Sequence, residues 1–307
     1  MEKIGFIGLG RMGLPMAANI IKGGYEVHVY DVVASQLEAA IAKGGQGCSS
    51  VAEIAEKSDI LITMLPNSAI VRDVISGSAD AILTHAKKGQ LVMDMSTVSP
   101  ETTDFVAGCC AEKHIDFIDA PVGRLASHAD TGQSLFMVGG TEAGYQRVLP
   151  LLQLMGSDIF HCGAQGAGTR TKLVNTFLAS SYCQMNAEAL ALASGFGLEL
   201  DSTLDVLYGT TAVNGQLKIA WPAKVLSDDK APGFTIDLAH KDLSLVVEAA
   251  NTQAVSMPMA AAAREAFNLA RSRGFGGDDF SAMLDVHCDL NQLKAPRLNP
   301  GSKYKPK

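Results

Sequence analysis

The chain has 307 residues, of which 47% are hydrophobic and 19% charged, and its 25 basic and 32 acidic side chains give a formal net charge of −7. This length predicts two domains, and this composition supplies enough apolar side chains for buried cores and excludes a disordered chain. The acidic balance argues against nucleic acid or an anionic membrane as the main partner, although a local cation in a pocket would still bind a small anion.

Apolar runs in the sequence are short. None reaches the roughly 18 residues of a membrane-spanning helix, and the beginning, MEKIGFIGLG, is typical of a first β-strand rather than a signal peptide. The six cysteines have no C-x-x-C spacing and the seven histidines have no metal-ligand spacing, so we expect no bound metal. Reduced thiols and a cytoplasmic location are the corresponding expectations.

Short β-like runs alternate with helical patterns over the first half of the chain. Helices are expected at residues 12–22 and 35–43, the second with Ser35 or a neighbour as N-cap. Several β-like runs are continuously apolar, as in sheets that are covered on both faces. This order predicts a mainly parallel, doubly wound Rossmann sheet in a dinucleotide-binding domain over residues 1–163. The expected strands cover residues 3–8, 26–30, 60–65, 91–94, 117–119, 135–138 and 159–161.

The alternation stops near Gly163, and the rest of the chain has helical patterns. A long helix over residues 169–194 would span roughly 39 Å, enough to join two domains. These patterns predict an all-α substrate and dimerisation domain over residues 164–293, then a flexible tail, 294–307, rich in Pro, Lys and Gly. The shorter helices are expected at residues 202–208, capped by Asp201, and at 235–251, 258–271 and 279–290.

The sequence Gly8-Leu9-Gly10-Arg11-Met12-Gly13 fits G-x-G-x-x-G, follows the first expected strand and begins a helix. In that context the backbone binds a dinucleotide pyrophosphate at the helix N-terminus. Asp31 follows the second strand, where a carboxylate binds the adenosine ribose hydroxyls and repels a 2′-phosphate. Residues 32 and 33 are valines, so no arginine is placed to hold that phosphate. The predicted cofactor is NAD rather than NADP.

Further clusters follow other expected strands, at the carboxyl edge where open α/β sheets bind ligands. Leu65 and Pro66 lie at the end of one strand, and Ser96 and Thr97 follow another in DMSTVSP. We assign Leu65, Pro66 and Thr97 to cofactor binding and Ser96 to substrate binding. A third strand ends in DAPVGR, and GAGTRTK leads into the long helix.

The motifs GFIGLGRMGLPMA, DMSTVSP, DAPV, GAGTRTKLVN and FTIDLAHKDL together resemble the β-hydroxyacid dehydrogenases, a family that includes 3-hydroxyisobutyrate dehydrogenase and, more distantly, 6-phosphogluconate dehydrogenase. The resemblance covers nearly the whole chain. It implies an NAD-dependent oxidoreductase with Lys172 as catalytic acid, Asn175 as a substrate-binding amide and Lys241 near the nicotinamide. Many members have a second asparagine where this chain has Thr176. The resemblance also suggests a homodimer or homotetramer.

The implied role of Lys172 agrees with its chemistry. Reduction of an aldehyde develops negative charge on the carbonyl oxygen, which an ammonium stabilises and protonates. Oxidation in the reverse direction needs a partly neutral amine, whose pKa must lie below the ordinary value of about 10.4. Burial beside Arg124 and Lys241 would lower it. The alternatives are a solvated helix lysine at 172 and, at 241, a surface ion pair with Asp242 or Asp237.

The substrate side departs from the commoner family pattern D-A-P-V-S-G-G, because Gly123 and Arg124 follow D-A-P-V here. Arginine holds an oxyanion through two charge-assisted hydrogen bonds, although a structural arginine paired with a carboxylate is the alternative. The P-V-G-R sequence is similar to the sulfolactaldehyde reductase branch of the family. That similarity implies reduction of 3-sulfolactaldehyde to 2,3-dihydroxypropane-1-sulfonate, with the sulfonate held by Arg124, Asn175 and a serine. The serine position is Ala179 here, followed by Ser180, so this contact is lost, shifted or supplied by water.

Other functions remain open at this point. Arg124 suits a carboxylate semialdehyde, such as succinic, methylmalonic or tartronic semialdehyde, equally well. A non-catalytic NAD-binding protein predicts a replaced Lys172, and an imine reductase of the same fold usually lacks this lysine, whereas Lys172 is present. The sequence therefore predicts an NADH-dependent reductase of a small anionic aldehyde.

Overall fold

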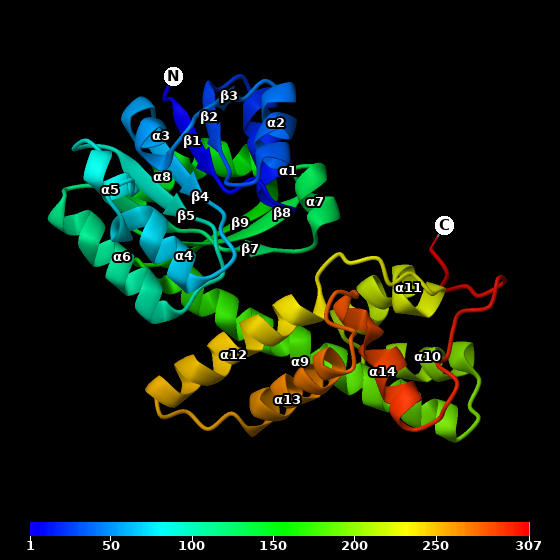
Figure 1. The fold of residues 1–307 in the computed structure, drawn as a ribbon. Helices are drawn as coiled ribbons and strands as arrows, with labels where there is room; N and C mark the ends of the chain where they lie inside the picture. Colours follow the sequence, from blue (N-terminus) through cyan, green and yellow to red (C-terminus); the bar gives the residue numbers. More distant parts are fainter. Residues whose placement is uncertain (307) are drawn as a thin grey trace. The chain divides into compact units, whose positions relative to one another are not determined.

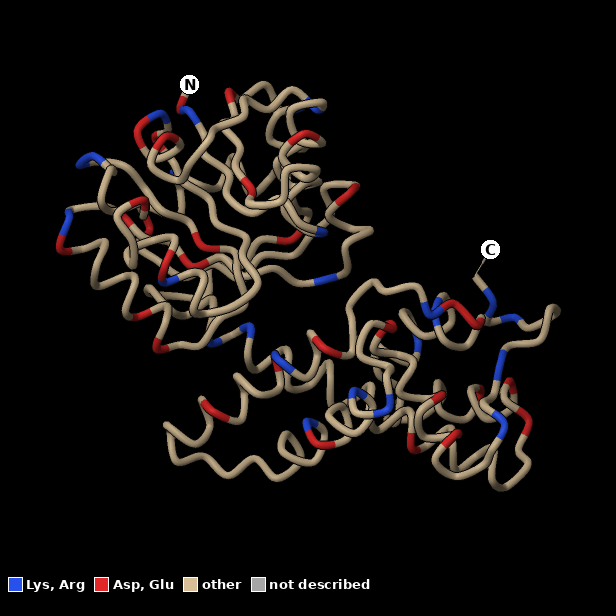
Figure 2. Tube along the Cα trace, viewed as in Figure 1, with Lys and Arg blue, Asp and Glu red and all other residues tan. Residues whose placement is uncertain are grey.

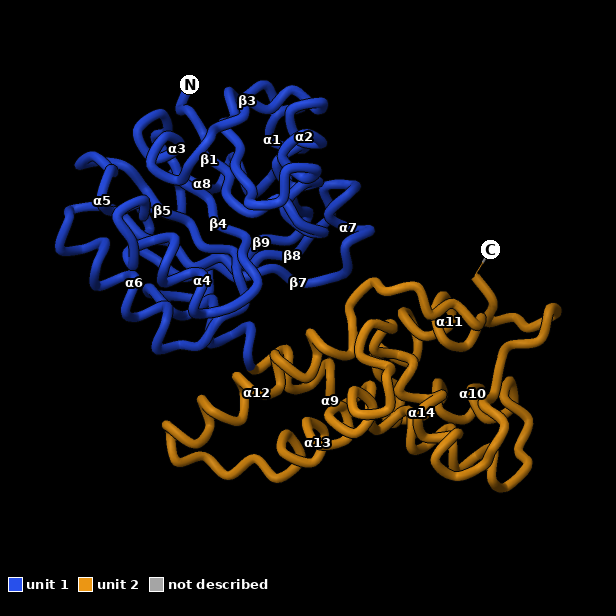
Figure 3. The backbone as a smooth tube through the Cα atoms, in the orientation of Figure 1, with its two compact units in different colours: residues 1–173 blue, residues 174–307 orange. Residues whose placement is uncertain are grey.

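The computed structural model of the protein describes residues 1–306. They form two compact units, Met1–Leu173 (unit 1) and the chain from Val174 onward (unit 2), which Figure 3 shows in blue and orange. Unit 1 is a sheet covered by helices, and unit 2 is helical (Figure 1). The division falls inside the long helix, ten residues after the expected domain boundary at residue 163.

Unit 1 contains a nine-stranded sheet with the order β3-β2-β1-β4-β5-β6-β8-β7, and β9 also pairs with β8. Within the described residues the pairs β6–β8 and β7–β8 are antiparallel and the others are parallel. The predicted doubly wound, mainly parallel sheet is therefore confirmed. The strands are β1 Ile4–Ile7, β2 Val27–Tyr30, β3 Gln46–Gly47, β4 Ile60–Thr63, β5 Leu91–Asp94, β6 Asp116–Asp119, β7 Val122–Gly123, β8 Ser134–Gly139 and β9 Gly156–Gly163.

Helices cover both faces of this sheet, and the burial pattern shows why. Phe6 and Ile7, neighbours on β1, belong to different core clusters, as expected when successive side chains point to opposite faces. Ser35 lies inside its helix, whose N-cap Val33 makes no side-chain hydrogen bond, so the expected serine cap was wrong. The helices of unit 1 are α1 Gly13–Lys22, α2 Ala34–Ala42, α3 Val51–Lys57, α4 Ser68–Arg72, α5 Ile82–His85, α6 Pro100–Glu112, α7 Ala126–Asp130 and α8 Glu142–Met155, with a π-helical turn at Asp73–Gly77.

The long helix α9, Ala167–Gly195, begins in unit 1 and has 29 residues, which corresponds to about 44 Å. The all-α character predicted for the second half is confirmed, and the described part of unit 2 adds only one isolated β-bridge. Glu199, rather than the expected Asp201, caps α10, because its carboxylate accepts from the N–H groups of residues 201 and 202. The other helices of unit 2 are α10 Leu200–Tyr208, α11 Trp221–Ala223, α12 Ile236–Thr252, α13 Pro258–Ser272 and α14 Met283–Leu290, with shorter turns at Gln216–Ala220, Val225–Ser227 and Phe280–Ala282.

Charged residues of both signs are interspersed along each unit (Figure 2). Among residues 1–306, no helix combines the length and the apolar character needed to cross a membrane. Within the same residues, no three His, Cys, Asp or Glu side chains are grouped so that they could hold a metal ion. All six cysteines are free thiols.

Candidate active site

A row of buried polar side chains lies at the carboxyl ends of three neighbouring strands. The sheet register pairs Thr63 of β4 with Asp94 of β5, and Asp94 with Asp119 of β6. All three are at most 2% exposed. Thr63 Oγ1 donates to Asp94 Oδ1 at 2.8 Å, and burial raises the pKa of both carboxyl groups. The loops that the sequence singled out after β5 and β6 therefore start from one shared, buried row.

Ser96 connects the loops that follow β4 and β5. Its Oγ donates to Asp94 Oδ1 at 2.6 Å and accepts from the Leu65 N–H at 2.9 Å, and the side chain is buried. Pro66 and Thr97 are the next residues of the two loops, so four predicted site residues come together here. The observed contacts of Ser96 hold this loop pair, a role that the sequence did not reveal, and its substrate contact stays a prediction.

The glycines of the glycine loop, residues 8–13, meet two requirements, the packing of the fold and the approach of a ligand. Gly8 has φ +95°, and a Cβ added there would lie 2.3 Å from the Met64 carbonyl oxygen. A Cβ on Gly13 would lie 1.9 Å from the carbonyl oxygen of Gly8, so these two glycines are required by the fold itself. A Cβ on Gly10 would meet no atom within 4 Å. Gly10 therefore leaves an open backbone surface, which is what a bound pyrophosphate needs.

Asp31 and the start of α1 complete the cofactor side. Asp31 follows β2, and its carboxylate accepts from the Leu9 N–H at 2.6 Å and the Val33 N–H at 2.7 Å. Met12, the N-cap of α1, makes no side-chain cap hydrogen bond, and Arg11 is exposed. The N–H groups of the first turn of α1 are thus not consumed by a side-chain cap and suit a phosphate anion. These residues fit NAD, whose adenosine ribose would lie beside Asp31.

The start of α9 is fixed to the end of β6 by a carboxylate from far along the chain. Asp119 Oδ1 accepts from the Gly166 N–H and Oδ2 from the Thr169 N–H, both at 2.7 Å. Asp119 therefore satisfies N–H groups that the first turn of the helix would leave without a partner, and its charge suits the helix N-terminus. Gly168 makes the close approach possible, since a Cβ there would lie 2.2 Å from the Met137 carbonyl oxygen.

Lys172 lies in the second turn of α9, and its Nζ donates to the Val122 carbonyl oxygen on β7 at 2.7 Å. Arg170, two residues earlier, ties the helix to α6 through a two-point pair with Asp104, at 3.1 and 2.8 Å. Arg124 follows Val122 by two residues. The structure thus places Lys172 Nζ against β7, which contains Gly123 and ends one residue before Arg124.

Arg124 itself is held by the protein. Its backbone has φ +73°, and its Nη1 donates to the Gln133 carbonyl oxygen at 2.7 Å and to Ser157 Oγ at 2.8 Å. Its Nη2 donates to Asp158 Oδ2 at 2.6 Å, and both charged side chains are partly exposed. The carboxylate partner considered as the alternative for Arg124 is therefore present. Its substrate contact remains a prediction.

The other candidates belong to unit 2. On α9, Asn175 is exposed, one turn beyond Lys172, whereas Ala179 is half-buried and Ser180 is buried. On α12, Lys241 Nζ lies 2.7 Å from Asp242 Oδ1, so the ion pair considered for it is present. None of these positions tests the substrate or cofactor role that the sequence predicts for the residue.

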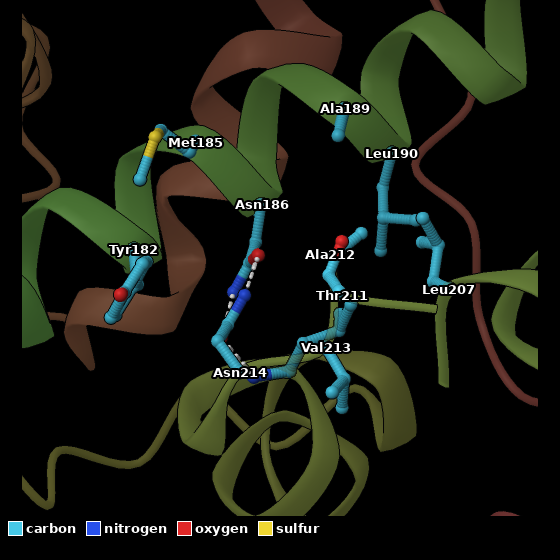
Figure 4. Close-up of a pocket in the computed structure, with 11 residues that line it drawn as sticks. Tyr182, Met185, Asn186, Ala189, Leu190, Leu207, Thr211, Ala212, Val213 and Asn214 are labelled. Carbon is cyan, nitrogen blue, oxygen red and sulfur yellow. Dashed lines mark hydrogen bonds between the residues drawn. The ribbon is translucent and has the colours of Figure 1, made fainter. Parts of the chain in front are cut away.

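Unit 2 also contains a pocket of about 280 Å³ between α9, α10 and the segment that follows α10 (Figure 4). None of the predicted site residues lines it. Asn186 and Asn214 face each other across it with reciprocal amide hydrogen bonds of 3.1 and 2.8 Å. Much of the remaining wall is apolar, including Met185, Leu190 and Leu207. Because the two amides satisfy each other, they point to no ligand.

Two family models match the chain. The NAD binding domain of 6-phosphogluconate dehydrogenase matches residues 3–163, and the model described as NAD-binding of NADP-dependent 3-hydroxyisobutyrate dehydrogenase matches residues 166–287. The chain belongs to the β-hydroxyacid dehydrogenase family. Its N-terminal domain binds NAD, and the protein is an oxidoreductase that acts on CH–OH groups.

The curated relatives cover nearly the full length of the chain. The 3-sulfolactaldehyde reductase of Escherichia coli is 39% identical over 285 residues, covering 93% of this chain and 95% of the relative. The 2-(hydroxymethyl)glutarate dehydrogenase of Eubacterium barkeri is also 39% identical, covering 92% and 94%. The structure of Mycobacterium tuberculosis 3-hydroxyisobutyrate dehydrogenase with L-serine has a TM-score of 0.85 and 30% identity, covering 93% and 99%. The family and fold expected from the sequence are confirmed.

Proposed function

We propose that this enzyme is an NADH-dependent reductase of a small anionic aldehyde, with 3-sulfolactaldehyde as its main substrate and Lys172 as the general acid. The observation that carries the proposal is the bond between Lys172 Nζ and the Val122 carbonyl oxygen, which fixes the amine against β7, at a residue that precedes Arg124 by two positions. An ammonium for the carbonyl oxygen and a guanidinium for a distant anion are the two charges that this substrate class needs.

The proposed mechanism assigns one task to each side chain. Bound NADH supplies the hydride that the carbonyl carbon receives. Lys172 donates a proton to the carbonyl oxygen as negative charge develops there, while the Val122 carbonyl oxygen accepts another N–H of the same group and holds it in place. Arg124 binds the anionic end of the substrate, and Asn175, one turn along α9, donates an amide hydrogen bond.

The preference for NAD over NADP rests on Asp31. Its carboxylate is fixed by the N–H groups of Leu9 and Val33, so it stays at the end of β2, where the adenosine ribose lies in sheets of this kind. A 2′-phosphate would face this negative charge. We also propose a homodimer or homotetramer, which the exposed apolar side chains of Val174 and Leu192 on α9, and of Phe196 directly after it, support.

A second candidate is a carboxylate semialdehyde. The identity to 2-(hydroxymethyl)glutarate dehydrogenase equals that to 3-sulfolactaldehyde reductase, and guanidinium binds carboxylate and sulfonate by the same two-point contact. Ala179 stands where the sulfonate branch would place a serine. The preference for sulfonate or carboxylate would then depend on the residues around Arg124 and on Ser180.

The test is NADH oxidation with paired aldehydes. 3-Sulfolactaldehyde is compared with tartronic, succinic and methylmalonic semialdehydes, and we expect the highest kcat/KM for the sulfonate. Lys172→Ala should lower kcat by about 100- to 10,000-fold, the usual contribution of a general acid, with the NADH dissociation constant nearly unchanged. Lys113→Ala, at an exposed lysine after α6, is the matched control. Turnover retained by Lys172→Ala would reject the acid role.

A further inference from the structure

The strand that faces Arg124 contains an irregularity. The pairing of β8 with β9 joins Ser134 to Gly156 and Leu135 to Asp158, so Ser157 is an extra residue in β9. Such a β-bulge changes the direction of side chains and is frequent beside active sites. In a regular strand, residues 157 and 158 would point to opposite faces. Here both contact the same guanidinium.

The three side chains form a closed ring of hydrogen bonds. Arg124 Nη1 donates to Ser157 Oγ, Ser157 Oγ donates to Asp158 Oδ2 at 2.8 Å, and Asp158 Oδ2 also accepts from Arg124 Nη2. The bonds from Ser157 and Arg124 lower the pKa of Asp158, which therefore remains a carboxylate at neutral pH. Every member of the ring fixes the other two.

The ring leaves part of the guanidinium available. Arginine has five N–H groups, and three of those of Arg124 are used by Gln133, Ser157 and Asp158. Nε and the second hydrogen of Nη2 have no acceptor within residues 1–306. Two neighbouring N–H groups are enough for a two-point contact with an oxyanion.

The backbone of Arg124 adds a second, independent observation. A non-glycine residue at φ +73° is strained, and such a conformation persists where the surroundings hold it and is frequent at functional sites. The ring and the Gln133 carbonyl oxygen provide that hold. A guanidinium on a strained backbone without these bonds would sample several orientations, and an anion would then have to select one of them.

We propose that Ser157 and Asp158 are positioning residues, which the bulge in β9 turns toward Arg124 so that its guanidinium is fixed in the orientation that binds the anionic end of the substrate. This inference rests on the proposed function, because it assumes that Arg124 contacts the substrate. It assigns substrate selectivity to two residues that act through Arg124.

The test compares an anionic and an uncharged aldehyde. 3-Sulfolactaldehyde and glyceraldehyde, in which a hydroxyl replaces the sulfonate, are reduced by the full-length enzyme and by Asp158→Ala, Asp158→Asn and Ser157→Ala. We expect Asp158→Ala to raise KM for the anionic aldehyde about tenfold, with kcat and the KM for glyceraldehyde within a factor of two. Asp158→Asn keeps an acceptor without charge and should restore part of the loss.

Two further variants separate positioning from a general structural effect. Glu2→Ala removes another partly exposed arginine–carboxylate pair of unit 1, that between Glu2 and Arg147, and should leave both KM values unchanged. In an Arg124→Ala background, Asp158→Ala should add nothing. If Asp158→Ala does not fold, Ser157→Ala, which removes the hydroxyl alone, provides the same comparison and should raise KM for the anion about threefold.

The outcomes distinguish the positioning role of Ser157 and Asp158 from the proposed function of the enzyme. If Arg124→Ala raises KM for the anion and the variants of Ser157 and Asp158 do not, the positioning role is wrong and the proposed function stands. If Asp158→Ala lowers that KM, the carboxylate competes with the substrate and the positioning role is again wrong. If Arg124→Ala leaves KM unchanged, or no anionic aldehyde is reduced, the proposed function fails and this inference fails with it.

Discussion

At the scale of single residues, the carboxyl groups of Asp94 and Asp119 lie buried side by side at the ends of β5 and β6, and burial raises the pKa of each. Buried charges of one sign are costly unless donors surround them. Asp119 accepts from two backbone N–H groups of α9, and Asp94 accepts from Thr63 and Ser96. The buried charge of Asp119 caps the N-terminus of α9. The hydrogen-bond donors around Asp94, in contrast, would also suit a neutral acceptor.

The first prediction concerns Asp94→Asn. The folded-state pKa of Asp94 lies above the ordinary value of 3.8, so the folded protein binds more protons than the unfolded chain in that window. The contribution of Asp94 to the free energy of unfolding therefore falls as pH rises from about 4 through the raised pKa. Asn keeps the Oδ1 acceptor without the charge. We expect Asp94→Asn to unfold at a higher temperature than wild type at pH 7, and the difference to shrink toward pH 4.

Thermal unfolding between pH 3.5 and 8 checks this expectation. Asp116→Asn, at the exposed first residue of β6, is the control for a change of one charge. If the difference in unfolding temperature between Asp94→Asn and wild type varies with pH no more than that of the control, the predicted cost of burying the Asp94 charge is wrong.

The residues to which we assign the chemistry were recognisable in the sequence because each lies in a local motif. Lys172 follows a glycine-rich segment, Arg124 follows D-A-P-V, and Asp31 follows a strand. Their partners were not recognisable. Asp158 accepts from Arg124, 34 residues earlier, beside the bulge in β9, and Asp119 caps a helix that begins 48 residues later. Contacts at such sequence separation depend on the register of the sheet, which no local pattern encodes.

At the element scale, glycines lie at or just before the first turns of both α1 and α9, for different physical reasons. Gly10, before α1, faces no protein atom within 4 Å, whereas Gly168, in the first turn of α9, lies directly against β8. Substitution by alanine should therefore have different consequences at the two positions. Gly10→Ala tests the cofactor surface, and Gly168→Ala tests the packing that positions Lys172.

We expect Gly10→Ala to unfold at the wild-type temperature without cofactor but to bind NADH at least about tenfold more weakly, because the new methyl group stands where the pyrophosphate approaches. Gly168→Ala should lower the unfolding temperature and kcat together, since its Cβ would lie 2.2 Å from the Met137 carbonyl oxygen and α9 must move. Calorimetry measures the unfolding temperatures, and titration with NADH measures its binding. Gly108→Ala, at an open position of α6, is the control. Equal NADH binding by Gly10→Ala would contradict the cofactor surface.

Periodicity predicted most regular elements of the fold. Continuous apolar runs located β1, β4 and β5, and the 3.6-residue pattern located α1, α12 and α13 within two residues of their ends. Two-residue strands such as β7 contain too few residues to show a period, and the antiparallel pairing of β8 was not predicted. The cap of α10 was misplaced because aspartate is the commoner cap, whereas Glu199 reaches the same N–H groups with a longer side chain.

At the scale of the whole molecule, each unit has its own hydrophobic core. The clusters of unit 1 contain Phe6 and Ile54, and that of unit 2 contains Phe267 and Trp221, the single tryptophan of the chain. Trp221 is fully buried, so its fluorescence reports the unfolding of unit 2 alone. Circular dichroism at far-ultraviolet wavelengths reports both units. The two signals together measure how far the units unfold independently.

We expect NAD⁺ to affect these signals unequally. The glycine loop and Asp31 belong to unit 1, and a ligand at 100 times its dissociation constant stabilises the folded form that binds it by about 2.7 kcal/mol. For a unit of this size that corresponds to a rise of about 5–10 °C in the unfolding temperature. The part of the dichroism transition that belongs to unit 1 should rise by this amount, and the Trp221 transition should rise by less than half of it. At the same NAD⁺ concentration Gly10→Ala, which should bind at least about tenfold more weakly, should show about half of this rise or less. Equal shifts of both signals in the wild type would mean that α9 couples the two cores into one cooperative unit, and the separate cores would then not unfold separately.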